Sequence, residues 1–561
     1  MEQTKNYTIG CDFGTLSMRT VIVDVSNGDI AAEHTYNYPH GVISERLPDS
    51  DVVLSGPHWA LQHPDDYINA LREGIPSVLK AAGVDKDSVI GIAVDFTTCT
   101  VLPMTEDGTV LCQLEEYRER PHAWVKLWKN HTANTEAEMF TQVCERTGST
   151  VLDDYGFRAS SEWFFPKVLE VLRKDKEVYD KAWTFIEGGD YIVYKLTGNI
   201  KRSSCFAAAK GLYDNGAHRY PPKEFFRELD PAFENVVEDK HLGNIIPVGS
   251  RAGELTAEMA DMLGLNAGTS VCVAHADAAV ALIGAGIVHT NEIIFVMGTS
   301  SCQIVMSDTK EQIPGMFGVY KDGVLPGCYT YEAGQGAVGD IFDWFCRNYV
   351  PASYYDEAEA QGISIYALLS QKAENLKIGE SGLLALDWMN GNRCILQDSD
   401  LTGLVMGYTL RTKAEEVFRA LVEATAFGTK IIMDAFAEYN VPINNIFACG
   451  GLAHKSPFIM QIYADIVNKD IILTAMPQTS ALSSSIFAAV AAGCERGGYD
   501  DFETAVAHMV KPPKHVYRPI PENVEAYQPL FHIYKDMHDL MGRDQNSPLK
   551  RLRNYQKQVL Q

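Results

Sequence analysis

Near its start the chain carries an acidic residue directly before a glycine turn. Asp12 ends an apolar, strand-like run, and Gly14 and Thr15 follow within three residues. A carboxylate at this point can hold a hydrated Mg²⁺, while the N–H groups and the threonine hydroxyl of the turn can bind phosphate oxygens. The pattern therefore indicates phosphate chemistry, although a turn of this composition also joins many hairpins in a purely structural role.

Two further glycine turns could serve the same chemistry. Gly298 and Thr299 repeat the donors of the first turn without an acidic residue. Gly450 and Gly451 end an apolar run before an expected helix, where a nucleotide can lie against bare backbone. Each of these is compatible with a structural turn when taken singly, so they point to a nucleotide site only as a group.

The turns stand at related places in two halves of the chain. Residues 7–36 are predicted to form a strand, the Gly14 turn and two more strands, and residues 291–308 a strand, the Gly298 turn and a strand. The two glycines are 284 residues apart (298 − 14), about half of the 561-residue length. A repeat at this offset predicts two domains of similar topology.

The remaining pattern is that of mixed α/β domains. A continuous apolar run predicts a buried strand at residues 89–96, and apolar residues at helical spacing precede it. Further elements are expected as helices at 64–82, 161–183, 413–439 and 457–468 and as a strand at 443–451. The fold class is therefore α/β, and the basic residues 546–561 are expected to form a helical C-terminal tail.

Composition indicates which macromolecular partners and which cellular compartment to expect. The chain holds 48 Lys and Arg against 73 Asp and Glu, a net charge of −25 that disfavours nucleic acid and anionic membrane surfaces. Its 12 cysteines are scattered without a CxxC pair, as in proteins of a reducing compartment. A strand-like run begins within the first residues, so no signal peptide is expected there. These features predict a cytoplasmic protein without nucleic-acid or membrane partners.

Several ordered motifs resemble one protein family. They are GCDFGT at 10–15, EGGDYIVYKLTG at 187–198, AHADAAVALIGAG at 274–286, MGTSS at 297–301 and ACGGLAHKSPFIMQIYAD at 448–465. In this order they look like the motifs of the FGGY carbohydrate kinases, and the similarity extends over about residues 7–495. The resemblance implies two actin-like (ribonuclease H-like) ATPase domains with an interdomain cleft, each built on a mixed five-stranded sheet.

The resemblance also implies domain ranges and a substrate. Residues 1–285 would form the sugar-side domain and 286–545 the nucleotide-side domain, followed by the tail. The stretches YEAGQGAVGDIFDWF (331–345) and LDWMNGNR (386–393) are similar to the ribulokinase branch of the family. That similarity implies ATP-dependent phosphorylation of a ketopentose at its terminal hydroxyl, with L-ribulose preferred, as a step of L-arabinose catabolism. D-ribulose and xylulose stay open as substrates, and so does a homodimer.

The same resemblance implies roles on the sugar side. Asp277 falls where the family keeps its catalytic base, which binds the sugar and takes the proton of the attacking hydroxyl. Lys210, Glu332 and Thr98 match positions that contact the sugar. A charged donor and a charged acceptor give a polyhydroxylated ligand strong, directional hydrogen bonds. Members of this branch often carry alanine where Thr98 stands, so its hydroxyl is expected to alter the range of sugars accepted.

On the nucleotide side the resemblance implies ATP and Mg²⁺ as cofactors. Asp12 matches the metal-associated acid, which acts through water. The matching phosphate turns and adenine-side residues are Gly14, Thr15, Gly298, Thr299, Gly450 and Gly451. Two alternatives of other classes are a non-catalytic actin-like nucleotide-binding protein and an inactive sugar sensor. The presence of both Asp12 and Asp277 argues against the sensor, and the sugar-facing YEAGQG motif argues against the actin-like protein.

Overall fold

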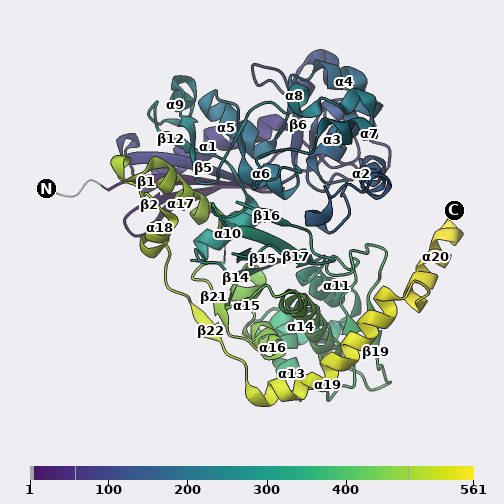
Figure 1. Ribbon diagram of the computed structural model, residues 1–561. Coiled ribbons are helices and arrows are strands. Elements are labelled where there is room, and N and C mark those ends of the chain that lie inside the picture. The colour runs from purple at the N-terminus through teal and green to yellow at the C-terminus, as the bar shows by residue number, and fades with distance from the viewer. Residues whose placement is uncertain (1–4, 57, 478, 561) are drawn as a thin grey trace. The chain divides into compact units, whose positions relative to one another are not determined.

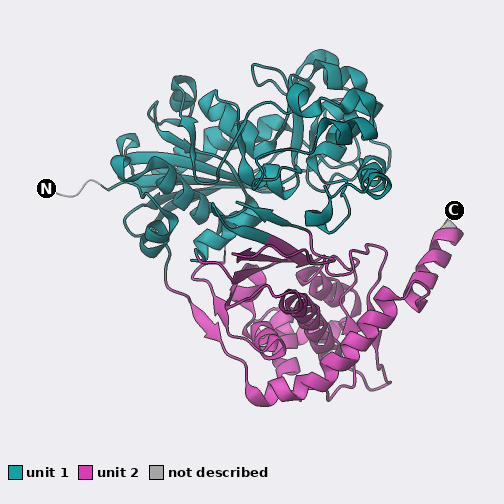
Figure 2. Ribbon diagram, in the orientation of Figure 1, with its two compact units in different colours: residues 1–288, 318–330, 479–511 teal, residues 289–317, 331–478, 512–561 magenta. Residues whose placement is uncertain are grey.

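The computed structural model describes residues 5–56, 58–477 and 479–560, which form two compact units (Figure 2). Unit 1 consists of residues 1–288, 318–330 and 479–511, and unit 2 of residues 289–317, 331–478 and 512–561. The two domain ranges expected from the sequence each run continuously along the chain. In the structure, by contrast, residues 479–511 pack within unit 1.

Unit 1 is built around a mixed sheet. Its strands are β1 (Tyr7–Phe13), β2 (Ser17–Asp24), β3 (Ile30–Asn37), β5 (Val89–Phe96), β11 (Arg251–Glu254), β12 (Ser270–Cys272) and β13 (His275–Ala276). They run in the order β11-β12-β5-β1-β2-β3, with β13 also pairing β5. β1 is antiparallel to β2 and parallel to β5. The hairpin around Gly14 and the buried strand at 89–96 are therefore confirmed.

Two helices pack closely on this sheet. α1 (Pro64–Ala82), which has the predicted bounds, contacts β2 and β3, and α17 (Ser480–Ala492) lies along β1 and β5 (Figure 1). The approach of α17 is so close that a Cβ on Gly10 would lie 2.0 Å from the Ala481 carbonyl oxygen. Glycine in β1 thus admits α17, which explains why this late segment belongs to unit 1.

Unit 1 also contains a smaller sheet with strand order β4-β7-β6-β8. These strands and the other short ones are β4 (Leu61–Gln62), β6 (Val101–Met104), β7 (Val125–Lys126), β8 (Thr184–Glu187), β9 (Lys201–Ser203), β10 (Asn244–Ile246) and β16 (Val319–Lys321). The remaining helices are α2 (Asn134–Thr147), α3 (Phe164–Lys174), α4 (Lys176–Lys181), α5 (Gly188–Thr197), α6 (Ser204–Ala209), α7 (Lys223–Leu229), α8 (Val236–Lys240), α9 (Ala257–Leu263), α10 (Asp277–Gly284) and α18 (Phe502–Met509). α3 and α4 together occupy the predicted helical stretch at 161–183.

Unit 2 repeats the topology of the first sheet. Its strands are β14 (Glu292–Met297), β15 (Ser301–Ser307), β17 (Tyr329–Gln335), β20 (Asn445–Cys449), β21 (Ile471–Leu473) and β22 (His515–Tyr517). β14 is antiparallel to β15 and parallel to β20, as β1 is to β2 and β5. This confirms the predicted duplication. The expectation of five strands per sheet was too low, because the described residues form seven strands in each of these two sheets.

Helices complete unit 2 around the long, buried α14. They are α11 (Gly339–Tyr349), α12 (Ala352–Gln361), α13 (Ile365–Glu374), α14 (Ala414–Glu438), α15 (Gly451–Lys455), α16 (Pro457–Val467), α19 (Pro521–His538) and α20 (Pro548–Leu560), with the hairpin β18 (Leu384–Leu386) and β19 (Leu404–Met406). α14, α16 and the C-terminal α20 confirm three predicted helices. Every helix in the described part of the chain is too short or too polar to span a bilayer.

Candidate active site

Three carboxylates lie at one end of the unit 1 sheet. Asp12 of β1 pairs in register with Asp95 of β5, which also pairs with His275, two residues before Asp277. Because parallel strands end at the same edge of a sheet, this register brings the three carboxylates together. Sequence reasoning named Asp12 and Asp277 but missed Asp95, whose one signal was its place at the end of the buried run 89–96.

Burial sets the protonation of the Asp12–Asp95 pair. Asp95 is fully buried, and its Oδ2 accepts a 2.5 Å hydrogen bond from the hydroxyl of Ser484 in α17. Burial and the adjacent Asp12 charge raise the pKa of Asp95 well above its usual value. Burial also raises the pKa of Asp12, but this side chain stays partly exposed. Asp95 is therefore the partner that keeps the proton, which leaves Asp12 to carry the charge toward a ligand.

The carboxylate of Asp277 is held at the first position of α10. It is partly exposed, and its Oδ1 accepts a 2.7 Å hydrogen bond from the N–H of Ala278. The Ser480 hydroxyl donates to the main-chain carbonyl of Asp277 at 3.3 Å, which fixes the backbone from the start of α17. An oriented carboxylate at a helix N-terminus, where the dipole favours the charged form, can act as a general base.

His275, two residues before Asp277 in the sequence, has a buried imidazole. Its Nδ1 lies 3.1 Å from the Ala276 carbonyl oxygen, and burial lowers its pKa to about 4. Between pH 6.5 and pH 4 the imidazole is protonated in the unfolded chain but neutral in the folded chain. The free energy of unfolding therefore falls as the pH drops through this range.

We expect His275→Gln to reduce the slope of the free energy of unfolding against pH by about 1 kcal/mol per pH unit near pH 5. Native-state hydrogen exchange of α10 measures it, and an unchanged slope would contradict the assignment.

Two of the predicted sugar-side residues lie near each other in unit 1. The loop 97–100 joins β5 to β6, and within it only Thr98 is partly exposed. Lys210 follows α6 and is 7% exposed. Burial raises the pKa of the Cys99 thiol, and the ammonium groups of Lys167 and Lys210 oppose that shift. Lys210 is therefore within electrostatic reach of the loop that presents Thr98.

The Gly14–Thr15 turn is held by side chains from outside the hairpin. The N–H of Gly14 donates to the Ser17 carbonyl at 2.9 Å and closes the turn. Gln62 donates its side-chain N–H to the Thr15 carbonyl at 2.8 Å, and the Trp128 indole donates to the Thr15 hydroxyl at 3.0 Å. The turn that follows Asp12 therefore has a fixed shape, as a phosphate-binding turn requires.

In unit 2 the predicted nucleotide residues gather where β14 and β20 end. Gly450 has a φ of 97°, and a Cβ there would lie 2.2 Å from the Met297 carbonyl oxygen, directly before Gly298. The N–H groups of residues 338–340 donate to the carbonyls of Gly298 and Thr299 at 2.8–3.1 Å. The structure thus brings Gly298, Thr299 and the Gly450–Gly451 turn together at one edge.

A pocket of about 610 Å³ adjoins the Gly298 turn. Asp340 lines this pocket and donates its N–H to the Thr299 carbonyl at 3.1 Å. The other lining residues are Ala337, Ile341, Trp344, Met389, Asn390, Gly403, Leu404 and Val405. The volume suits a small organic ligand. The sequence analysis gave these residues no role in a site, although most of them lie in the stretches 331–345 and 386–393 that carry the resemblance.

Glu332, the remaining sugar-side residue, lies on β17 in unit 2. Its Oε1 is 3.7 Å from the guanidinium of Arg393, which packs over the Phe317 ring. Thr98 and Lys210 belong to unit 1. A shared sugar site for the three residues therefore stays a prediction.

Comparison with known proteins identifies relatives along nearly the whole chain. The model of the FGGY family of carbohydrate kinases, N-terminal domain, matches residues 7–284, and that of the C-terminal domain matches residues 293–492. The chain is 49% identical over 543 residues to a ribulokinase of Bacillus licheniformis, covering 96% of this chain and 98% of the relative. It is 47% identical over 551 residues to a ribulokinase of Anoxybacillus flavithermus, covering 98% and 97%.

Solved structures share the fold. A xylulose kinase from Rhodospirillum rubrum superposes with a TM-score of 0.77 at 21% identity, covering 95% of this chain and 98% of the other. A gluconate kinase from Lactobacillus acidophilus gives a TM-score of 0.79 at 20% identity, covering 96% and 98%. At these identities the likeness concerns the fold alone.

Proposed function

The chain belongs to the FGGY family of carbohydrate kinases, and we propose that within it this protein transfers the γ-phosphoryl group of ATP to the terminal hydroxyl of L-ribulose. The observation that carries the proposal is the 46–49% identity to five ribulokinases, over 96–98% of the chain. The product would be L-ribulose 5-phosphate, a step of L-arabinose catabolism. The charge of −25 agrees with a neutral sugar as substrate, with the anionic nucleotide held by local donors.

The proposed chemistry begins at Asp277. Its carboxylate accepts the proton of the terminal sugar hydroxyl, and that oxygen attacks the γ-phosphorus as the bond to ADP breaks. Lys210 donates to sugar oxygens, Glu332 accepts from sugar hydroxyls, and Thr98 contributes a hydroxyl at the exposed point of its loop. The Gly14–Thr15 and Gly298–Thr299 turns bind phosphate oxygens. The pocket beside Asp340 takes the nucleoside, with Gly450 and Gly451 at its backbone edge.

The residues around Asp12 fit a magnesium ion held mostly by the nucleotide. Within the described residues no three His, Cys, Asp or Glu side chains converge on a metal site. Mg²⁺ keeps several waters and is commonly bound through one or two carboxylates and substrate phosphates, which matches a single charged Asp12 beside a protonated Asp95. Such an ion would neutralise charge on the phosphates. Asp12 would position it through water.

Replacing Asp12 by alanine tests this role. We expect a higher KM for Mg²⁺-ATP and a lower kcat, with part of the activity recovered as the Mg²⁺ concentration is raised, because the phosphates can still bind the ion. Steady-state kinetics over a Mg²⁺ series measures this. If added Mg²⁺ recovers none of the lost activity, Asp12 has no metal role.

Replacing the charged sugar contacts should act mainly on sugar affinity. A hydrogen bond to a charged group is worth about 1.5–3 kcal/mol, so Lys210→Met and Glu332→Gln should each raise the KM for L-ribulose roughly ten- to a hundredfold. Lys181→Met, an exposed lysine of unit 1, is the matched control and should leave KM unchanged. A KM for L-ribulose within twofold of wild type in either variant removes that residue from the sugar site.

The proposed substrate is tested by a coupled ADP-release assay. The panel contains L-ribulose, D-ribulose, both xyluloses, aldopentoses, pentitols, glycerol and a hexose, each compared by kcat/KM. We expect L-ribulose to rank first. A higher kcat/KM with glycerol or a hexose would overturn the ribulokinase proposal while leaving the family unaffected, and a higher value with another pentulose would change the substrate alone.

A further inference from the structure

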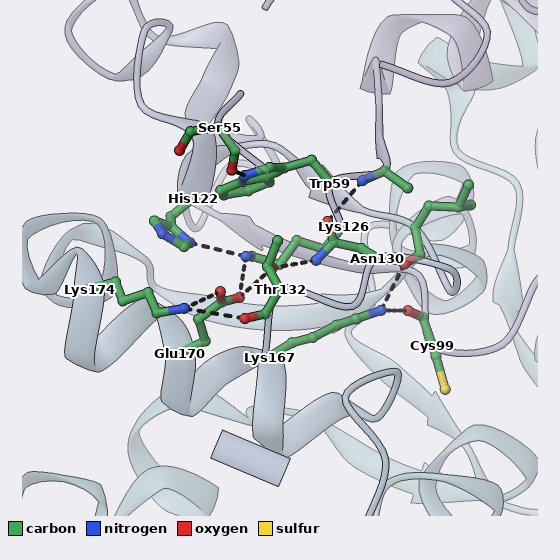
Figure 3. Close-up of polar contacts among 12 residues, drawn as sticks. Ser55, Trp59, Cys99, His122, Lys126, Asn130, Thr132, Lys167, Glu170 and Lys174 are labelled. Carbon is green, nitrogen blue, oxygen red and sulfur yellow. Dashed lines mark hydrogen bonds and ion pairs between the residues drawn. The ribbon is translucent and has the colours of Figure 1, made fainter. Parts of the chain in front are cut away.

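A fully buried lysine in unit 1 joins two irregular segments of the main chain (Figure 3). Lys167, on α3, is 0% exposed, and its Nζ donates to the carbonyl of Cys99 at 2.6 Å and to the carbonyl of Leu127 at 2.8 Å. Both of its hydrogen bonds within the described residues therefore go to main-chain carbonyls. Neither goes to a carboxylate.

The first carbonyl belongs to the loop that presents Thr98. Cys99 adopts a φ of 67°, a region that non-glycine residues rarely occupy. The loop is also tied by a 2.8 Å hydrogen bond between the hydroxyls of Thr97 and Thr100, and by the N–H of Gly188 to the Thr100 carbonyl at 2.7 Å. Lys167 satisfies the carbonyl next to Thr98, so its position bears on where the Thr98 hydroxyl points.

The second carbonyl belongs to the segment that supports the phosphate turn. Leu127 is followed by Trp128, whose indole donates to the Thr15 hydroxyl at 3.0 Å. Two further buried contacts hold the same segment. Lys126 forms an ion pair with Glu170 of α3 at 2.6 Å, and the side-chain oxygen of Asn130 accepts a hydrogen bond from the N–H of Ala60 at 2.9 Å. The helix α3 therefore contacts this segment through two side chains, Lys167 at Leu127 and Glu170 at Lys126 (Figure 3).

Packing alone does not account for a lysine at this position. Burying an ammonium group costs free energy that an apolar side chain of similar length would avoid. Burial lowers the pKa of Lys167 to about 8, the direction expected for an ammonium group removed from water. What offsets this cost is hydrogen bonding to two buried main-chain carbonyls, that of Cys99 and that of Leu127, the second of which also accepts the N–H of Asn130 at 2.9 Å.

We propose that Lys167 is a positioning residue of the kinase, which fixes the spacing between the Thr98 loop and the Trp128 segment that holds Thr15. The proposal rests on the proposed function, because it takes Thr98 as a sugar contact and Thr15 as part of a phosphate turn. Lys167 itself touches no reacting atom and acts through these two residues.

A double-mutant cycle tests the proposal. Lys167→Met keeps the side-chain length and removes the donors, and it should raise the KM for L-ribulose about tenfold. In a Thr98→Ala background the same change should raise it no more than about twofold, because the group that Lys167 positions is gone. Lys176→Met is the control, since this exposed lysine lies on the next helix, α4, and pairs with Asp180 of that helix at 2.6 Å. It should leave KM unchanged.

Two outcomes would overturn the proposal: an unchanged KM in Lys167→Met, or the same fold-change with and without the Thr98 hydroxyl. Native-state hydrogen exchange of the unmodified protein gives a measurement that needs no variant. The main-chain N–H groups of Thr97 and Asn130, each bonded to a main-chain carbonyl, should exchange through one common opening. Openings of unequal free energy would contradict the coupling of the two segments by Lys167. A wild-type protein inactive on L-ribulose would defeat the proposed function, whereas the exchange result would still decide whether Lys167 couples the segments.

Discussion

The variant Asp277→Asn is expected to lower kcat by roughly 10²–10⁴-fold, the usual contribution of a general base. The amide keeps the shape of the side chain, and its oxygen can still accept the N–H of Ala278, which lies 2.7 Å from Oδ1 in the native protein. It cannot accept the proton of the attacking hydroxyl. We therefore expect the KM for L-ribulose to change much less than kcat in steady-state kinetics.

The matched control is Asp261→Asn, an exposed aspartate on α9 of the same unit. This control should retain wild-type kcat and KM, which excludes a general effect of the lost charge. A different pattern in Asp277→Asn, with kcat intact and sugar binding lost, would make Asp277 a sugar ligand and would leave the base unassigned.

The second large effect is expected on stability rather than on rate. In Glu170→Gln, the ammonium of Lys126 would be left buried without its charge partner, which in the native protein lies 2.6 Å away. Although burial opposes it, the neighbouring ammonium groups hold the pKa of Glu170 at about 2, so the native carboxylate is charged at neutral pH. Breaking such a pair from one side costs about 3–5 kcal/mol. Native-state hydrogen exchange of α3 measures this loss locally.

The exposed pair on the next helix provides the comparison. Lys176 and Asp180 of α4 form an ion pair at 2.6 Å with both side chains more than half exposed. Asp180→Asn should therefore cost no more than about 0.5 kcal/mol. Equal losses of unfolding free energy in Glu170→Gln and Asp180→Asn would show that burial does not strengthen the Lys126–Glu170 ion pair, which would contradict this prediction.

Local sequence pattern was sufficient for the elements that carry their own signal. The helix at 64–82 has apolar residues at regular spacing and was predicted with its bounds. The two hairpins have a glycine turn between apolar runs and were predicted to within one residue at their outer ends. Asp12 was visible because a carboxylate directly before a glycine turn can hold a hydrated Mg²⁺ beside donors for phosphate. The role of Asp277 came from a family resemblance, since its surroundings read equally well as a helix start.

Residues whose importance depends on distant contacts could not be predicted in this way. Asp95 matters because strand register places it beside Asp12 and because Ser484, 389 residues away, bonds to it. The packing of α17 on Gly10 has the same character, and so does the burial of Lys167 between two loops. The identity of a lysine or a serine in the sequence does not indicate which distant residue it will contact. The partner exists only in the folded chain.

Phosphorus NMR of one reaction mixture tests the central claim most directly. The protein is incubated with ATP, Mg²⁺ and L-ribulose, and the product is assigned by the coupling of its phosphorus to neighbouring protons. The account predicts that the γ-phosphate signal disappears as ADP and a phosphomonoester on the C5 oxygen of L-ribulose form in equal amounts, with no such product from Asp277→Asn within the same time. Release of inorganic phosphate alone, or a phosphoester at another carbon, would contradict it.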